Sequence, residues 1–291
     1  MPDPTTPLVS PLVSPDDVAA ALDGGTPPVL LDIRWRLGGP PGIDEYRAGH
    51  IPGAVYLDLD TQLAAPPGAG GRHPLPDPGA LQEVLRDAGV RSGSSVVAYD
   101  ADNGSVAARA WWQLRWAGHR AVSVLDGGYA AWVAAGRPTS TAVPTPEPGD
   151  IEVRPGGMPV LDADQAATLA RTGVLLDARA PERYRGEVEP IDPRAGHVPG
   201  ARNAPFAGHL DASGRWHAPA ALAERFAGIG VRTGEPVGAY CGSGVTAASV
   251  VLALEASGVT SVDEPAALYA GSWSQWCADP DRPAATGDQP G

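Results

Sequence analysis

The sequence is poor in cysteine, methionine and phenylalanine, with two residues of each in a chain of 291. The two cysteines, Cys241 and Cys277, are too few for the disulfide framework of a small secreted domain. No group of cysteine and histidine residues has the spacing of metal ligands. We therefore expect reduced thiols, no metal and no cofactor.

Long apolar runs are also missing. No apolar stretch is long enough to cross a bilayer. The N-terminus has no basic segment, and proline interrupts it repeatedly, which argues against a signal peptide. These absences predict a soluble cytoplasmic protein that does not bind a membrane.

Positive charge is scarce. The sequence has 21 lysine and arginine residues against 34 aspartate and glutamate residues, which gives a net charge of -13. Nucleic acids and anionic membrane surfaces would repel such a protein at range. The expected partners are small molecules or proteins, and no nucleic acid. An anionic substrate would require a local cluster of arginines.

The chain repeats itself in order, at an offset of 141 to 147 residues. The matched stretches are LLDIR (30–34) with LLDAR (175–179), GHIPGA (49–54) with GHVPGA (196–201), VVAYD (96–100) with VGAYC (237–241), and LDGGYAAW (125–132) with LYAGSWSQW (268–276). Four matches at a nearly constant offset indicate a duplicated domain. We expect domains at 1–137 and 158–291, joined by a linker at 138–157 that is rich in proline, glycine and threonine.

Each half alternates short apolar runs with segments of helical periodicity. The expected strands are 28–34, 94–100, 173–179 and 235–241, and the expected helices are 77–89, 105–119, 218–230 and 244–258. This order is typical of an α/β fold in which helices cover both faces of a mainly parallel sheet. Ligands of such sheets bind at the carboxyl ends of the strands, where Cys241 lies.

The two halves differ in the loop that follows the predicted strand. The first half has Asp100 where the second has Cys241. Glycines in the loop that continues through Gly242, Ser243, Gly244, Val245 and Thr246 allow backbone N–H groups to face the sulfur at a helix N-terminus. This setting favours the thiolate, which is the nucleophilic form, over the alternative of an inert buried thiol.

Arginines also distinguish the second half. Arg183, Arg185 and Arg194 follow its first strand, whereas Gly38 corresponds to Arg183 in the first half. Such arginines predict a site for a carboxylate or a sulfur oxyanion, and the alternative for each is a solvated surface residue. Arg179 has a counterpart in the first half and is interpreted as part of a structural ion pair.

Together these stretches resemble the two-domain rhodanese family of sulfurtransferases, over about residues 8 to 280. The resemblance rests on LLDxR, GHxPGA and the loop CGSGVT that begins at Cys241. It implies an inactive first domain and an active second one, in which Cys241 takes sulfane sulfur from a donor as a persulfide. The acceptor would be cyanide or a thiol such as thioredoxin.

The resemblance also bears on the donor. Thiosulfate-preferring members have two cationic residues directly after the cysteine, whereas Gly242 and Ser243 are neutral, as in 3-mercaptopyruvate sulfurtransferases. Ser243 would polarise the donor thiol, and Arg183 matches the substrate arginine of the family. A second family arginine is replaced by Ile191, so Arg194 is the candidate substitute. These residues favour mercaptopyruvate over thiosulfate as the donor.

The family pattern further places the histidine of HIPG near the active cysteine. His50 is therefore a candidate partner of Ser243 in a catalytic relay, and Asp44 is a candidate residue to orient it. The GHxPGA turn occurs in both halves, however, which favours an architectural role for its histidines.

Two other functions compete with sulfur transfer. A cysteine phosphatase would need an arginine at the end of the loop, where Thr246 and Ala247 stand. A non-catalytic rhodanese-like binding or regulatory module is the more serious alternative, and the intact Cys241 loop argues against it. Cys277 has no glycine loop around it and is interpreted as a bystander.

Overall fold

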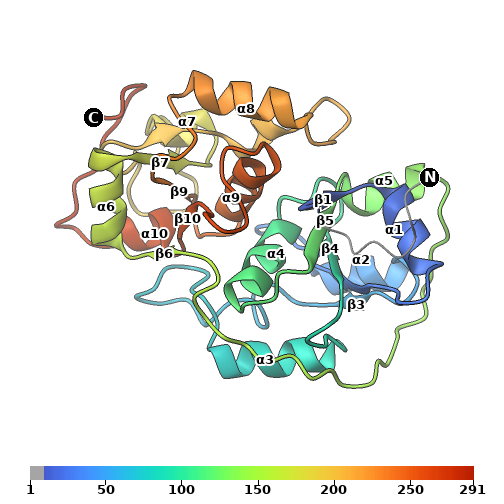
Figure 1. Ribbon diagram of the computed structural model, residues 1–291. Helices are drawn as coiled ribbons and strands as arrows, with labels where there is room; N and C mark the ends of the chain where they lie inside the picture. Colours follow the sequence, from blue (N-terminus) through green and yellow to red (C-terminus); the bar gives the residue numbers. More distant parts are fainter. Residues whose placement is uncertain (1–9) are drawn as a thin grey trace. The chain divides into compact units, whose positions relative to one another are not determined.

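The computed structural model describes residues 10–291, which divide into two compact units. Unit 1 comprises residues up to Ala64, Pro76–Gly157 and Ala212–Trp216. Unit 2 comprises Ala65–Leu75, Met158–Asp211 and His217–Gly291. Each unit is built around its own sheet, as expected for a duplicated domain (Figure 1).

Unit 1 contains a parallel sheet of five strands in the order β1-β5-β4-β2-β3. Its strands are β1 (Leu12–Val13), β2 (Val29–Asp32), β3 (Val55–Tyr56), β4 (Val96–Tyr99) and β5 (Val122–Leu125). Its helices are α1 (Pro15–Leu22), α2 (Gly42–Ala48), α3 (Pro78–Asp87), α4 (Ala107–Trp116) and α5 (Gly128–Ala134).

Unit 2 repeats this order as β6-β10-β9-β7-β8, again with parallel pairing throughout. Its strands are β6 (Val160–Leu161), β7 (Val174–Asp177), β8 (Arg202–Asn203), β9 (Val237–Tyr240) and β10 (Ala267–Tyr269). Its helices are α6 (Ala163–Thr172), α7 (Pro181–Tyr184), the 3-10 helix η1 (Phe206–His209), α8 (Pro219–Gly228), α9 (Ala247–Ala256) and α10 (Ser272–Trp276).

Local sequence explains where these elements form. The strands β4, β7 and β9 are buried along their whole length, which is why they read as continuous apolar runs. Asp162 caps α6 through a capping box with Gln165, and Asp77 caps α3. In unit 2, α6 and α10 cover one face of the sheet, while α8 and α9 lie on the other (Figure 1). The predicted α/β fold with two parallel-sheet domains is confirmed.

The sequence halves and the compact units are not identical. Residues 65–75 come from the first half of the chain but belong to unit 2, and residues 212–216 come from the second half but belong to unit 1. Residues 138–157, the expected linker, belong to unit 1. In this segment, Gly149 N–H donates to the Arg86 carbonyl and Arg154 N–H to the Ala117 carbonyl, so it runs along unit 1 as an extended chain.

The central strands β4 and β9 end at Tyr99 and Tyr240, so Asp100 and Cys241 begin equivalent loops at the carboxyl edges of their sheets.

Among residues 10–291, no helix is both long enough and apolar enough to cross a membrane.

Candidate active site

Cys241 begins a tight loop between β9 and α9, and only 2% of its surface is exposed. The Gly244 N–H donates to Sγ of Cys241 at 3.1 Å. Gly244 has φ of +82°, and a Cβ there would lie 2.5 Å from the Ala270 carbonyl oxygen, so a side chain is excluded. Backbone hydrogen bonds from Trp273 to the Cys241 carbonyl and from Ser274 to the Gly242 carbonyl fix the loop against α10. These contacts hold the loop around the sulfur, with the Gly244 N–H directed at it.

The equivalent loop of unit 1 holds a carboxylate. Oδ1 of Asp100 accepts N–H groups of Asp102, Asn103 and Gly104 at 3.2, 3.1 and 2.8 Å. Its Oδ2 accepts those of Val106 and Ala107 at 2.8 and 3.2 Å. Five backbone donors around one anion show that this loop geometry is suited to negative charge.

The two loops can be matched by their left-handed glycines, Gly104 and Gly244, and by the helices that follow at Ala107 and Ala247. The N–H groups of Thr246 and Ala247 then correspond to the pair that binds Oδ2 in unit 1. Within residues 10–291 these two N–H groups have no hydrogen-bond partner. In unit 2 the N–H groups of Thr246 and Ala247 are thus available to donate hydrogen bonds to an anion near the cysteine sulfur.

Ser243 belongs to this loop, and only 7% of its surface is exposed. Its Oγ lies 2.7 Å from Nδ1 of His73. His73 was not predicted. The predicted relay of His50 with Ser243 is corrected: His50 is fully buried, and its two ring nitrogens lie 2.8 and 3.1 Å from the carbonyl oxygens of Tyr46 and Ala142. His50 thereby ties the GHIPGA turn to residues that follow α5, which is an architectural role.

His73 lies on the segment 65–75, which belongs to unit 2. Gly71 has φ of +100°, and a Cβ there would lie 2.7 Å from the carbonyl oxygen of Gly271. The Arg72 N–H donates to Oγ of Ser274 at 3.1 Å. The segment is therefore seated directly on the start of α10, beside the Cys241 loop.

One sequence signal identifies His73. The stretch Gly71-Arg72-His73 has a counterpart in the second half, Gly214-Arg215-Trp216. Trp216 donates from its indole N–H to the Asn103 carbonyl of the Asp100 loop at 2.7 Å. The halves thus differ in this segment too, with histidine beside the cysteine and tryptophan beside the aspartate.

Arg183, the predicted substrate arginine, lies near the cysteine loop. An ideal Cβ on Gly242 would lie 3.6 Å from its Nη1. Its guanidinium pairs with Glu189 at 2.6 Å and with Asp192 at 3.2 Å. Burial raises the pKa of Glu189, but hydrogen bonds from Arg183 and from the Asp192 backbone outweigh it and leave the pKa below its usual value. Glu189 therefore stays charged, and its contacts hold the arginine in place.

Arg194 makes a different contact. Its Nη2 donates to the Asp279 carbonyl at 3.2 Å. Arg179 forms a buried ion pair with Asp177 at 2.6 Å, as its counterpart in the first half predicts. Cys277 is buried, and burial raises the pKa of its thiol, so its reactivity is low.

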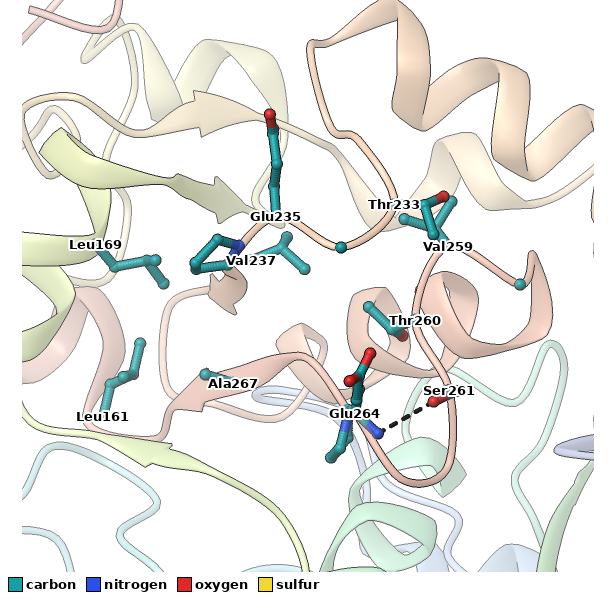
Figure 2. Close-up of a pocket in the computed structure, with 14 residues that line it drawn as sticks. Leu161, Leu169, Thr233, Glu235, Val237, Val259, Thr260, Ser261, Glu264 and Ala267 are labelled. Carbon is teal, nitrogen blue, oxygen red and sulfur yellow. Dashed lines mark hydrogen bonds between the residues drawn. The ribbon is translucent and has the colours of Figure 1, made fainter.

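A cavity of about 510 Å³ lies in unit 2 where β9 and β10 begin, lined by residues such as Leu169, Glu235 and Glu264 (Figure 2). The cavity lies at the end of the strands opposite to Cys241, and none of the predicted site residues lines it.

Within residues 10–291, no group of three or more His, Cys, Asp or Glu residues is arranged to hold a metal ion.

Comparison with known proteins gives concordant matches. The family model described as "Rhodanese-like domain" matches residues 14–135 and 162–279. The chain is 48% identical over 269 residues to the "Probable 3-mercaptopyruvate sulfurtransferase" of Pseudomonas aeruginosa, covering 89% of this chain and 93% of that protein. It is 43% identical over 282 residues to the "Putative thiosulfate sulfurtransferase SseB" of Mycobacterium tuberculosis H37Rv, covering 95% and 97%. The crystal structure of SseA from Escherichia coli, described as a 3-mercaptopyruvate sulfotransferase, matches with a TM-score of 0.78 and 32% identity, covering 91% of this chain and 99% of that one.

Proposed function

The chain belongs to the two-domain rhodanese family of sulfurtransferases, and from this premise we propose that unit 2 transfers sulfur from 3-mercaptopyruvate through a persulfide on Cys241. Unit 1, which has Asp100 in place of the cysteine, takes no part in the chemistry. The names of the relatives from P. aeruginosa and E. coli support this donor.

In the first half-reaction the Cys241 thiolate attacks the sulfur of the donor, and the donor's carbon–sulfur bond breaks. The cysteine becomes a persulfide anion, and the three-carbon fragment leaves as the enolate of pyruvate. The proton that was on the donor thiol is delivered to that carbon, which gives pyruvate. In the second half-reaction a cyanide ion or a thiolate attacks the outer sulfur and restores the Cys241 thiolate.

The observation that carries this proposal is the anion held by the loop of unit 1. A carboxylate oxygen of Asp100 is two bonds from Cβ, as is the outer sulfur of a cysteine persulfide. The N–H groups of Thr246 and Ala247, which match those that bind Asp100 Oδ2, would therefore receive the outer sulfur. The same donors stabilise the negative charge that develops during transfer.

The proton transfer is assigned to Ser243 and His73. Their contact of 2.7 Å is within the range of proton transfer. In this arrangement Ser243 hydrogen-bonds the donor thiol, and His73 accepts the proton through the hydroxyl and returns it to the enolate. Thiosulfate carries no thiol proton, so its reaction does not need this step.

Steady-state kinetics with both donors test the proposal. Purified protein is expected to form pyruvate from 3-mercaptopyruvate in the presence of cyanide or a thiol, with a higher kcat/KM than for thiosulfate. Cys241→Ser is expected to abolish turnover, whereas Cys277→Ser retains it. A folded wild-type protein that turns over neither donor would instead support a binding module.

A further inference from the structure

Arg72 contributes a cation to the Cys241 loop that the loop itself does not contain. Its Nη2 lies 2.9 Å from the position that a Cβ on Gly242 would take, and Nη1 of Arg183 lies 3.6 Å from the same point. The guanidinium thus occupies the space of the missing side chain at the residue directly after Cys241. The neutral sequence Gly242-Ser243 therefore does not mean a site without cations.

The N–H groups of Arg72 are only partly used by the protein. Nη1 pairs with Asp192, whose side chain is 3% exposed. Nη2 has no hydrogen-bond partner within residues 10–291, and neither has Nε, which is buried. On Arg183, Nη1 is likewise without such a partner, while Nε and Nη2 bind Glu189 and Asp192. Nη2 of Arg72 and Nη1 of Arg183 are therefore both unused by the protein and close to Gly242.

Asp192 shows that the two guanidiniums converge. Its Oδ1 binds Arg72 and its Oδ2 binds Arg183, so one carboxylate spans both arginines. Its backbone N–H donates to Oε1 of Glu189 at 3.1 Å, which fixes the position of this carboxylate. Asp192 thereby holds the two arginines side by side, with their remaining N–H groups available to a second anion.

We propose that Arg72 binds the carboxylate of the sulfur donor together with Arg183, and that it acts as a residue that determines donor specificity. This inference rests on the function proposed above for Cys241. A planar guanidinium group matches the geometry of a carboxylate. Two such groups compensate the carboxylate's charge and also set its orientation. A 2-oxo acid whose thiol lies at C3 would then present its sulfur to Cys241. Gly242 is essential to this arrangement because a larger residue would displace the Arg72 guanidinium.

The first test needs no sulfur donor. Iodoacetate and iodoacetamide alkylate cysteine by the same reaction, but only iodoacetate carries a carboxylate. Alkylation of Cys241, followed by mass spectrometry of its peptide, gives the ratio of the two rate constants. Because hydrogen bonds to charged groups contribute substantially to binding, Arg72→Ala and Arg72→Gln are each expected to lower the iodoacetate-to-iodoacetamide ratio about tenfold.

Arg185→Ala is the matched control. Arg185 is two residues from Arg183 in sequence, and it pairs on the surface with Glu187 at 2.8 Å. The control is expected to leave the ratio at the wild-type value. A ratio that is unchanged in both Arg72 variants, or that falls equally in Arg185→Ala, would overturn the proposal. Thermal melting of each variant identifies any loss of folding, and Arg72→Gln retains much of the side-chain volume if Arg72→Ala proves unstable.

Kinetics provide the second test. In Arg72→Gln, KM for 3-mercaptopyruvate is expected to rise about tenfold with a much smaller change in kcat, because the lost contact is to a non-reacting group. A fall in kcat with unchanged KM would contradict a role in donor binding. If the wild-type protein turns over no donor, the proposed function fails, and the alkylation ratio alone then decides the role of Arg72.

Discussion

Replacing Asp100 by asparagine removes the charge that five backbone N–H groups surround in unit 1. The amide oxygen can keep the three donors that bind Oδ1. The amide NH₂ group then faces the N–H groups of Val106 and Ala107, so two donors lose their acceptor. A buried unsatisfied donor costs about 1–3 kcal/mol, which gives a destabilisation of about 3 kcal/mol for the pair.

Urea unfolding measures this effect. With a slope of about 2 kcal/mol/M, the midpoint for unit 1 is expected to fall by about 1.5 M. Six of the eight tryptophans lie in unit 1, so tryptophan fluorescence mainly reports its unfolding. Both cysteines belong to unit 2, so alkylation of the buried Cys277 reports the other unit separately.

Asp102→Asn is the control, because the Asp102 side chain is 63% exposed and makes only a weak surface pair with Arg36 at 3.6 Å. Its expected effect is below about 0.5 kcal/mol. If Asp100→Asn shifts the midpoint no more than Asp102→Asn does, the loop does not depend on an anion. The comparison between Asp100 and a persulfide would then lose its basis.

Three further predictions concern other parts of unit 2. His73→Gln is expected to lower kcat for 3-mercaptopyruvate about a hundredfold while leaving thiosulfate turnover nearly unchanged, since only the first donor brings a thiol proton; equal losses would exclude the proton-transfer role. Gly71→Ala is expected to unseat segment 65–75, because its methyl group would lie 2.7 Å from the Gly271 carbonyl oxygen; faster hydrogen exchange of this segment with reduced activity supports this, and wild-type behaviour contradicts it. Burial, with a smaller contribution from the charge of Arg225, lowers the pKa of His209 to about 3 in the folded protein. Below about pH 6.5 the unfolded chain therefore binds a proton that the folded protein does not bind. The free energy of unfolding is expected to fall by about 2 kcal/mol between pH 7 and pH 5. Urea midpoints at the two pH values should show this loss in the wild-type protein and a smaller one in His209→Leu, and identical pH dependence in both would refute it.

The sequence predicted those features that depend on local pattern. Apolar runs identified β4 and β9, because a strand buried on both faces has no polar positions. The comparison of the two halves singled out Cys241, which stands where the first half has Asp100, in the loop in which the halves differ. Arg183 was identified in the same way, and the structure places it beside Gly242.

The partner of Ser243 was not predicted, because it depends on a contact between residues 170 positions apart. The segment 65–75 has no helical or strand periodicity, so its docking site cannot be inferred from pattern. The family pattern points to His50, although its turn occurs in both halves. The same comparison of halves, applied to His73 and Trp216, favours the histidine that contacts Ser243.

The most direct test of the central claim is the detection of a persulfide on Cys241. Protein treated with 3-mercaptopyruvate, without acceptor, is digested and its peptides are analysed by mass spectrometry. The account predicts one additional sulfur atom on the Cys241 peptide, removed by cyanide, and none on the Cys277 peptide. Release of pyruvate with an unmodified Cys241, or a persulfide on Cys277 instead, would contradict it.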